Sequence, residues 1–307
     1  MGPILLTGAT GQVGRELLRT LGAIPGAGEV IAPGRVSLDL SDAASNFRGF
    51  RETIRSVKPR WIVNPAAYTA VDKAESEPEA AYAVNALAVQ AIGEEAQAIG
   101  AGVIHFSTDY VFDGTKRDPY VESDTTAPLN VYGASKLRGE QALAASGAGH
   151  LTFRTSWVYG ATGKNFLLTV LKLAREREVL KIVADQHGAP TWSADLARMT
   201  AAVIAQCETM AAGDTLHETL AKVGGVYHAG GGGATTWYGF AAEAVRLRQQ
   251  CEPEVRFAEV QGIASVEFPT PAKRPGNSLL DCGRLQKSFG WTMMDWQDSL
   301  GKVLSEL

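Results

Sequence analysis

Short runs of apolar residues alternate with longer amphipathic stretches through the first half of the chain. The short runs are continuously apolar, which is typical of strands buried on both faces, and the stretches between them have helical spacing. Strands and helices that alternate in this way predict βαβ units and a Rossmann-like, doubly wound parallel sheet, hence an α/β fold. The predicted strands are 4–6, 29–32, 61–64, 103–107 and 151–155, and the predicted helices are 13–21, 46–57, 78–99 and 131–145.

The second half of the chain is less regular and predicts a smaller, mixed α/β C-terminal domain. Four consecutive glycines at 230–233 precede Thr235 and Thr236, which can cap a helix, so we interpret them as a turn and not as a linker. The segment 226–229 predicts a strand that can rejoin the main sheet. The remaining predicted elements are helices at 165–178, 193–206, 237–248 and 281–289, a strand at 181–184 and a loop at 268–275.

Composition and charge narrow the class of protein. The 307 residues are 45% hydrophobic and 20% charged, which is typical of a soluble globular protein. A net charge of -4 gives no positive field for nucleic acid or anionic lipid, so we expect neither as a partner. No apolar run approaches the roughly 18 residues of a membrane span, and no signal peptide precedes the first strand. Three widely spaced cysteines fit small hydrophobes in a reducing cytoplasm, and we predict a cytoplasmic location.

A glycine-rich segment follows the first predicted strand and opens the first helix. Gly8, Gly11 and Gly14 would permit a tight turn and a close approach of the backbone to a pyrophosphate. The helix N-terminus would add N–H groups and the positive end of a dipole. The same spacing also occurs in ordinary turns, but its place in a βαβ unit favours a dinucleotide cofactor.

The end of the second predicted strand indicates which nicotinamide cofactor is used. An acidic residue there would bind the ribose hydroxyls of NAD, whereas this chain has Arg35, which could accept a 2′-phosphate and favours NADPH. A solvated loop arginine is the alternative interpretation. Asp39 and Leu40 are candidates to contact the adenine, and residues 64–67 end the third strand where the cofactor should pass.

Tyr132 and Lys136 form a YxxxK motif near the start of a predicted helix. The spacing places the phenol and the ammonium on one face, where the ammonium favours the phenolate and lowers the pKa of the tyrosine. Tyr132 would then donate a proton to a ketone oxygen as hydride arrives. Thr108 ends the fourth predicted strand, 24 residues before Tyr132, and can hydrogen-bond the same oxygen. The motif alone is common, but the threonine, tyrosine and lysine behind a glycine loop form a specific signal.

With these motifs the chain resembles the dTDP-4-dehydrorhamnose reductase family of extended short-chain dehydrogenases/reductases over nearly its whole length. The matching segments are TGATGQVG, NPAAYTAVDKAESEPE, STDYVFDG, PLNVYGASKLRGE, RTSWVYG, NF, DQHGAPT and RPGNSLLD. The resemblance implies reduction of the 4-keto group of dTDP-4-dehydro-L-rhamnose to dTDP-L-rhamnose by NADPH, with NADH possible.

The resemblance also assigns residues to each ligand. It implies that Tyr132, Lys136 and Thr108 are catalytic. The cofactor site would comprise Gly8, Gly11, Gln12, Val13, Gly14, Asp39, Leu40, Pro65, Ala66 and Ala67, together with Arg35 and the tyrosine and lysine. The sugar nucleotide would contact Thr108, Asp109, Trp157, Asn165 and Arg274. Asn165 and Arg274 are the candidates for its diphosphate and nucleotide, and the protein would be a monomer or a homodimer.

Two positions depart from the pattern of the family, and the residues of a metal site seen in some relatives are incomplete. Pro65 stands where alanine is frequent, and it cannot donate a backbone hydrogen bond to the cofactor. Gly34 replaces an acidic residue at the end of the second strand, in keeping with NADPH. Some relatives dimerise through magnesium held by glutamates; Glu16 matches one such position, but the others are absent at Ser193 or Ala194 and at Gln297, so we predict no metal.

We predict a dinucleotide-binding domain of residues 1–157 plus about 220–248, and a substrate domain of about 158–219 and 249–307. Three alternatives share this fold. A 4,6-dehydratase needs an Asp-Glu pair, whereas Asp109 is followed by Tyr110, which argues against elimination. A 4-epimerase, or another sugar-nucleotide oxidoreductase, would keep the same three catalytic residues but an epimerase would consume no cofactor. A non-catalytic NADP-binding regulatory subunit would not need them.

Overall fold

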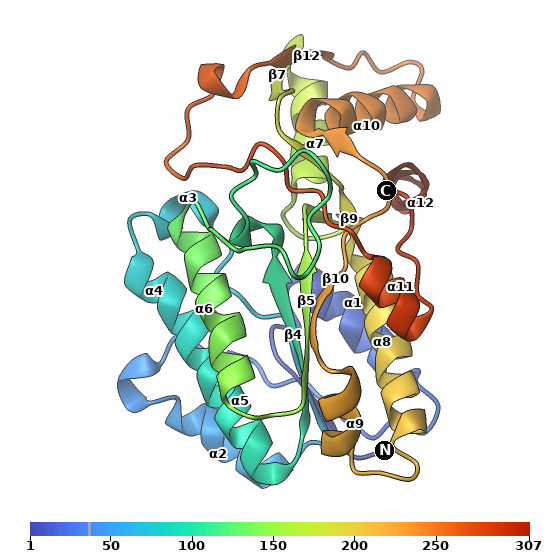
Figure 1. The fold of residues 1–307 in the computed structure, drawn as a ribbon. Helices are drawn as coiled ribbons and strands as arrows, with labels where there is room; N and C mark the ends of the chain where they lie inside the picture. The colour runs from blue at the N-terminus through green and yellow to red at the C-terminus, as the bar shows by residue number, and fades with distance from the viewer. Residues whose placement is uncertain (36–37) are drawn as a thin grey trace.

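The computed structural model describes residues 1–35 and 38–307, and its centre is a parallel sheet (Figure 1). Within the described residues this sheet has six strands in the order β10-β5-β4-β3-β1-β2, and each neighbouring pair is parallel. The chain winds outward from β1 in both directions, which is the predicted doubly wound topology. The strands are β1 (Ile4–Leu6), β2 (Val30–Ile31), β3 (Trp61–Asn64), β4 (Gly102–Thr108), β5 (His150–Thr155) and β10 (Gly225–His228).

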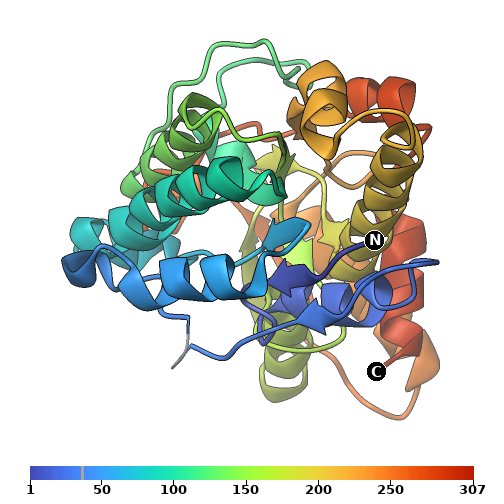
Figure 2. The ribbon, with the colours of Figure 1, turned by 90° about the horizontal axis from the view of Figure 1, so that it is seen from below.

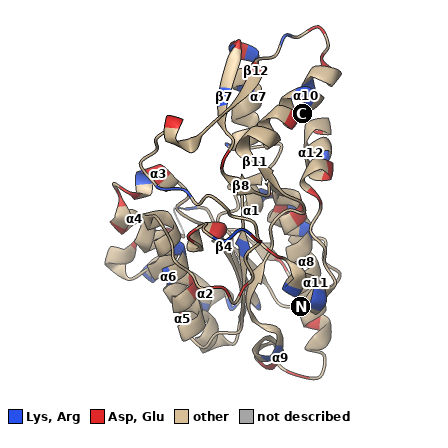
Figure 3. Cartoon of the chain, turned by 45° about the horizontal axis from the view of Figure 1, so that its top comes forward, with Lys and Arg blue, Asp and Glu red and all other residues tan. Residues whose placement is uncertain are grey.

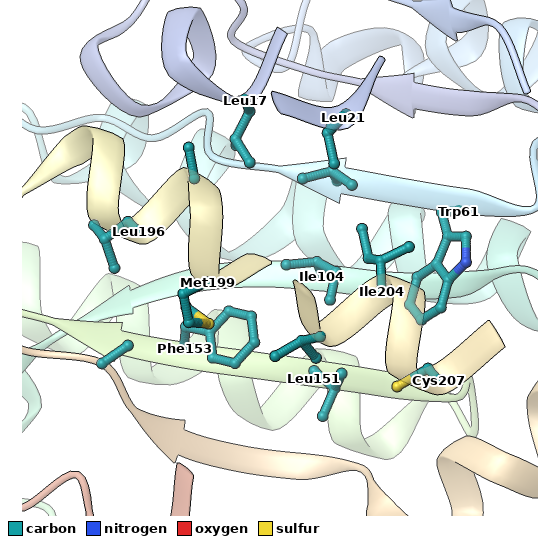
Figure 4. Packing of buried hydrophobic residues seen from close by; sticks show 14 of the residues in the cluster. Leu17, Leu21, Trp61, Ile104, Leu151, Phe153, Leu196, Met199, Ile204 and Cys207 are labelled. Atoms are coloured by element: carbon teal, nitrogen blue, oxygen red, sulfur yellow. The ribbon is translucent and has the colours of Figure 1, made fainter. Parts of the chain in front are cut away.

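Helices cover both faces of this sheet (Figure 2). On one face the apolar side chains of α1 and α8 pack on Ile4, Val63 and Ile104, and Figure 4 shows this layer with Leu17, Met199 and other members labelled. The helices of this face are α1 (Gln12–Leu21), α8 (Ser193–Met210), α9 (Leu216–Val223) and α11 (Gly283–Phe289).

The other face of the sheet buries the alternate residues of the same strands. Leu5, Ile62 and Val103 point to this side, as the period of two in a strand requires, and pack against apolar positions of the covering helices. The helices here are α2 (Arg48–Val57), α5 (Ala88–Ile99) and α6 (Val131–Ala145). Because both faces are buried, β1 and most of β3 are apolar, whereas β4 and β5 also bury polar residues such as His105 and Arg154.

A smaller mixed region lies beyond the carboxyl ends of the strands, at the top of Figure 1. Its apolar core joins side chains of three helices, among them Leu167, Phe240 and Leu300. The helices are α7 (Phe166–Glu176), α10 (Trp237–Cys251) and α12 (Trp296–Ser305). The strands pair as β7 (Val179–Val183) with β12 (Glu259–Ile263), β6 (Val158–Tyr159) with β9 (Thr191–Trp192), and β8 (His187–Gly188) with β11 (Thr235–Thr236).

Most predicted elements are present, and the predicted strand at 226–229 rejoins the main sheet as β10, parallel to β5. The helix predicted at 78–99 is present over these bounds, but it is not a uniform α-helix. That segment comprises α4 (Pro78–Tyr82), a π-helical turn η2 (Ala83–Leu87) and then α5. In the turn, the Asn85 side chain accepts a hydrogen bond from Tyr68 N at 2.8 Å and donates to Tyr68 O at 3.1 Å. No helix of the described segments combines the length and apolar character needed to cross a bilayer.

Two helices bear on the proposed division into domains. Helix α8 packs on α1 and on the main sheet, although the sequence interpretation places it in the substrate domain. Helix α10 packs on α7, α12 and β12, away from the main sheet. We therefore propose that α8 belongs with the dinucleotide-binding domain and α10 with the substrate domain.

Candidate active site

A cavity of about 670 Å³ lies at the carboxyl ends of β1, β3, β4 and β5. The strand order reverses between β1 and β3, and such a switch point is where parallel α/β sheets bind their ligands. Segments of the first domain and of the smaller region both contribute to its wall. The lining residues are Gly8, Thr10, Gly11, Gln12, Val13, Gly14, Pro65, Ala66, Ala67, Thr69, Phe106, Ser107, Thr108, Asp109, Tyr132, Lys136, Thr155, Trp157, Val158, Gly163 and Lys164.

The glycine loop forms one side of this cavity in a conformation that requires glycine. Gly8 has a φ of +55°, in the left-handed region. A Cβ on Gly14 would lie 2.0 Å from the carbonyl oxygen of Gly8, so a side chain there would push the turn off the helix. Gly11 begins α1 without a side-chain cap, which leaves the first amides of the helix for an anionic ligand. These features fit a pyrophosphate.

The end of β3 faces the glycine loop across the cavity. A Cβ on Gly8 would lie 2.9 Å from the Cα of Ala66, so these two backbone segments are in close contact. Pro65, Ala66 and Ala67 all line the cavity, as the sequence predicted for the path of a cofactor. Pro65 brings no N–H to that path, so any contact it makes is apolar or through its carbonyl.

The three residues predicted near the adenine and the 2′-phosphate lie outside the cavity wall as the described residues form it. The Arg35 side chain is 80% exposed; its Nη2 donates to Ser41 Oγ at 3.2 Å, and its Nε lies 3.6 Å from Asp39 Oδ1. Hydrogen bonds from Ser41 lower the pKa of Asp39. Leu40 is buried in the apolar layer under β1. The assignment of Arg35 and Asp39 to the cofactor stays a prediction.

Thr108 and Asp109 lie at the end of β4, which continues into the 3₁₀ turn η3 (Asp109–Val111). The Thr108 hydroxyl accepts from Tyr110 N at 3.2 Å and donates to Asp109 Oδ1 at 2.8 Å. Asp109 is buried, and burial raises its pKa to about 6. A carboxyl group with such a pKa can act as a hydrogen-bond donor or acceptor near neutral pH.

Helix α6 brings Tyr132 and Lys136 to the same cavity. It begins at Asn130, whose Oδ1 accepts from Gly133 N at 2.8 Å. Gly133 allows the helix to approach η3, because a Cβ there would lie 2.1 Å from Tyr110 O. The predicted lowering of the Tyr132 pKa is not found: burial raises it to about 12, although Thr108 acts in the lowering direction. Burial also lowers the pKa of Lys136 to about 8, and its Nζ donates to Phe106 O at 2.6 Å.

Polar atoms without protein partners gather at the ends of β4 and β5. Among the described residues, the buried Ser107 Oγ, Thr155 Oγ1 and Asp109 Oδ2 have no hydrogen-bond partner, and all three residues line the cavity. Buried polar groups are normally satisfied, so this arrangement indicates that a ligand completes their hydrogen bonds. Together with the glycine loop, the residues present fit a dinucleotide and a polar substrate.

Trp157 lines the cavity just past β5 in a strained conformation. Its φ is +46°, which is rare for a bulky side chain and common at functional sites. Its ring stacks on Trp237 at a centroid distance of 3.6 Å and an interplanar angle of 11°. Gly188 also lies close to this ring, since a Cβ there would lie 2.5 Å from the indole. The predicted contact of Trp157 with the ligand remains a prediction, and its position is suited to it.

Two other residues predicted to contact the substrate are not part of the cavity wall in the described structure. Asn165 caps α7: its Oδ1 accepts from Leu168 N at 3.0 Å, and its Nδ2 donates to Gln12 Oε1 at 2.6 Å. Arg274 belongs to the segment 268–280, which we call the strap, and it pairs with Asp72 at 2.8 Å. Their roles toward a substrate stay predictions.

The sequence interpretation missed several residues of the cavity. Lys164 lies in the turn before α7 and brings a cation to the wall that also contains the glycine loop. Its signal was a lysine directly before the recognised Asn-Phe pair, in a turn marked by Gly163. Ser107 and Thr155 had a signal too, as hydroxyls at strand carboxyl ends. Among the described residues no group of three His, Cys, Asp or Glu side chains is arranged to hold a metal ion.

Comparison with known proteins identifies the family to which this site belongs. The family model described as "RmlD substrate binding domain" matches residues 1–307. A dTDP-4-dehydrorhamnose reductase from Escherichia coli K12 is 45% identical over 304 residues, which covers 99% of this chain and 97% of the relative.

Two solved structures are similar over their whole length. A dTDP-4-dehydrorhamnose reductase from Clostridium acetobutylicum has a TM-score of 0.86 and 34% identity, and 99% of each chain is covered. One from Bacillus anthracis, in complex with NADP, has a TM-score of 0.85 and 31% identity, and 100% of each chain is covered. The whole chain, including the smaller region, is therefore shared with these relatives.

Proposed function

The chain belongs to the dTDP-4-dehydrorhamnose reductase family of NAD(P)H-dependent oxidoreductases, and from this premise we propose that it reduces dTDP-4-dehydro-L-rhamnose to dTDP-L-rhamnose. The observation that carries the proposal is the single cavity into which the glycine loop, Thr108, Tyr132 and Lys136 all open. A binding module has no need for an acid, a positioning hydroxyl and a buried ammonium at one place.

In the proposed reaction a nicotinamide cofactor supplies hydride to C4 of the sugar. Tyr132 donates its proton to the C4 oxygen, and Thr108 hydrogen-bonds the same oxygen and orients it. Burial keeps Tyr132 protonated before the reaction, since its pKa is raised to about 12. The Lys136 ammonium favours the phenolate that remains after proton transfer.

The cofactor would lie across the carboxyl edge of the sheet. Its pyrophosphate would meet the first amides of α1 at Gly11, Gln12 and Val13, and Lys164 lies on the same wall. We propose NADPH as the preferred donor, because Arg35 follows β2 where NAD-dependent enzymes have a carboxylate. A structural relative is solved in complex with NADP, which supports this choice.

The decisive experiment offers purified protein the 4-keto sugar nucleotide and follows the absorbance of NADPH and NADH separately. We expect stoichiometric oxidation of NADPH. The Tyr132→Phe variant should lose roughly 10²- to 10⁴-fold in kcat, the usual contribution of a general acid, and should keep its affinity for NADPH. Tyr82→Phe, at an exposed helical tyrosine outside the cavity, is the matched control and should keep its activity.

The other outcomes separate the alternatives. Isomerisation of the sugar without net loss of NADPH would show an epimerase. If wild type and Tyr132→Phe are equally inactive while both bind NADPH, the proposed function is wrong and the regulatory role gains support.

A further inference from the structure

Behind Lys136, a chain of buried polar side chains leads away from the cavity to the end of β1. The Lys136 Nζ lies 3.5 Å from His105 Nε2, and the Asn64 Nδ2 lies 3.1 Å from His105 Nδ1. Asn64 Oδ1 in turn accepts from Thr7 Oγ1 at 2.6 Å. The chain thus joins side chains from β4, β3 and the loop after β1 to the lysine on α6.

All four of these side chains are shielded from water. Their exposed fractions are 1% for Thr7, 1% for Asn64, 0% for His105 and 1% for Lys136. Burial, and then the charge of the nearby ammonium, holds the pKa of His105 well below its usual value. The imidazole is therefore neutral and carries one proton, on either Nδ1 or Nε2.

The position of that proton depends on the charge of Lys136. An ammonium has only donors, so it needs the bare Nε2 as an acceptor, and the ring proton must then be on Nδ1. A neutral amine has a lone pair and can accept from a protonated Nε2, while it still donates to Phe106 O. Each charge state of the lysine therefore matches one tautomer of His105.

Asn64 is suited to serve both tautomers. Its amide oxygen can accept from Nδ1–H, and after a half-turn its NH₂ group can donate to a bare Nδ1. The structure shows Nδ2 toward His105, which matches the amine form of the lysine. Thr7 tolerates either orientation, because a hydroxyl can donate to the amide oxygen or accept from the amide nitrogen.

We propose that His105 is a positioning residue whose imidazole tautomer is coupled, through Asn64, to the charge of Lys136. The chain of hydrogen bonds thereby satisfies Lys136 both as an ammonium and as an amine. Because the pKa of Lys136 is lowered to about 8, both charge states are accessible near neutral pH, and without this chain one of them would leave an unpaired buried group.

Other titratable groups around the lysine do not replace this coupling. Glu140 faces Lys136 from α6 itself, Tyr132 precedes Lys136 by one turn of that helix, and Asp109 faces Tyr132 from η3. Glu140 is engaged with Arg154 of β5 in a two-pronged ion pair, with Nε to Oε1 at 2.9 Å and Nη2 to Oε2 at 2.7 Å. On β5, His150 adds only repulsion toward His105.

The first test reads the tautomer directly and needs no turnover. The ¹⁵N chemical shifts of histidine-labelled protein with bound NADPH report which ring nitrogen carries the proton, and the His105→Gln spectrum identifies the signal. We expect Nδ1–H at about pH 6 and Nε2–H at about pH 10, two units on either side of the Lys136 pKa of about 8. In Lys136→Met the tautomer should not change with pH. A charged imidazolium, or one tautomer throughout in wild type, would overturn the proposal.

The second test is kinetic and rests on the proposed function. The alkaline limb of kcat/KM should move to lower pH by about one unit in His105→Leu, because the ammonium loses its acceptor in a buried site. His105→Gln, whose amide also offers an oxygen or an N–H, should restore the limb. A loss of stability alone would change the amount of active protein but not the pH of this limb. An alkaline limb that stays at the wild-type pH in His105→Leu would contradict the coupling. If the chain reduces no sugar nucleotide, the tautomer measurement still tests the coupling between His105 and Lys136.

Discussion

Asp109, Tyr132 and Lys136 are residues whose burial opposes their charged forms. The pKa values are raised to about 6 for Asp109 and about 12 for Tyr132, and lowered to about 8 for Lys136. Each shift is free energy that the fold gives up to hold an ionisable group away from water. We expect such a site to be less stable than a neutral replacement, as is common where activity needs strained or desolvated groups.

The replacement Asp109→Asn should therefore stabilise the protein near neutral pH. The native pKa of about 6 lies above the ordinary value of 3.8, so between these values the native state binds more protons than the unfolded state. The contribution of Asp109 to the free energy of unfolding should fall as pH rises from about 4 to about 6, and remain lower above that range. Relative to wild type, the variant should gain up to about 2–3 kcal/mol at pH 7.

Urea unfolding at a series of pH values measures this difference. Asp113→Asn is the matched control, because Asp113 is only partly buried and its pKa is lowered, mainly by the backbone N–H of Thr115. The ionised Asp113 stabilises the protein above the ordinary pKa of 3.8, and this stabilisation is lost as pH falls through the lower native pKa. The pH dependence therefore has the opposite sign to that of Asp109. If both variants show the same pH dependence, the account of Asp109 is wrong.

For single residues, the sequence predicts those site positions that depend only on spacing within one turn or one helix. The glycine loop and the pair Tyr132 and Lys136 follow from spacing along one turn and one helix, and the structure places them on one cavity. The partner of a long polar side chain depends on tertiary neighbours and is not encoded locally. Asn165 caps α7 and Arg274 pairs with Asp72. Spacing along the chain does not reveal either contact.

Among the elements, α6 joins the reaction site to the structural core. The first turn of the helix carries Tyr132, the second carries Lys136, and Glu140 follows one turn later. Glu140 and Arg154 of β5 form a pair in which each side chain is only 5% exposed. This pair fixes the middle of α6 against the sheet, and the position of Lys136 depends on it.

Removal of the negative charge by Glu140→Gln should be strongly destabilising. The Arg154 guanidinium would stay buried with no counter-charge, and its Nη1 already has no partner among the described residues. Breaking one side of a buried pair typically costs about 3–5 kcal/mol. The midpoint of urea unfolding, followed by circular dichroism, measures the loss.

Glu243→Gln provides the comparison on the surface. Glu243 pairs with Arg246 one turn along α10, where the arginine side chain is 53% exposed. Such pairs contribute at most about 1 kcal/mol. A loss in Glu140→Gln no larger than that of this control would show that α6 is held by its apolar contacts alone.

Element prediction succeeded where hydrophobic periodicity was strong. Strand β3 has the predicted bounds because it is almost continuously apolar, whereas helix α6 has them although its buried face includes Lys136 and Glu140 and is no apolar stripe. Helix α9 is short, with a capping box at Thr215 and Glu218, and was missed. Strand β12 was missed because most of its residues are exposed, and its pairing with β7 is a tertiary property. The π-helical turn arises from Asn85 and has no sequence period.

For the molecule as a whole, the strap joins the two regions. It leaves the smaller region after η4 (Ser265–Glu267) and crosses toward α11, as the red-orange trace in Figure 1 shows. On the way Asn130 Nδ2 donates to Lys273 O at 2.8 Å, and Asn277 N donates to Gly114 O at 3.1 Å. Figure 3 shows acidic and basic residues interspersed over the helices of both regions, so local pairs and not a global field determine such contacts.

Asp72 of α3 (Val71–Ala74) makes the charged contact of the strap. Its carboxylate accepts from Ala272 N at 3.2 Å and from both terminal nitrogens of Arg274, at 3.1 and 2.8 Å. Hydrogen bonds from Arg274 lower the pKa of Asp72, so the pair remains charged at neutral pH. The Asp72 side chain is 43% exposed, and solvent screening limits what the pair contributes.

Asp72→Asn should therefore loosen the strap without unfolding the protein. Lys273 is exposed within the strap, so trypsin can report its local opening by cleavage after this residue. A loss of about 1 kcal/mol in the opening free energy corresponds to about fivefold faster cleavage. The difference from wild type should shrink at high salt, since screening weakens the pair in wild type.

Asp214→Asn is the matched control, because Asp214 pairs with Lys222 on the exposed surface near α9, away from the strap. It should leave cleavage at Lys273 unchanged, and both variants should keep the wild-type unfolding midpoint within about 1 kcal/mol. Equal cleavage rates in wild type and Asp72→Asn would mean that the backbone contacts of Lys273 and Asn277 hold the strap by themselves. If the difference in rate between Asp72→Asn and wild type does not shrink at high salt, the effect comes from lost hydrogen-bond geometry and not from charge. The predicted combination, faster cleavage and salt dependence, requires the ion pair between the two regions.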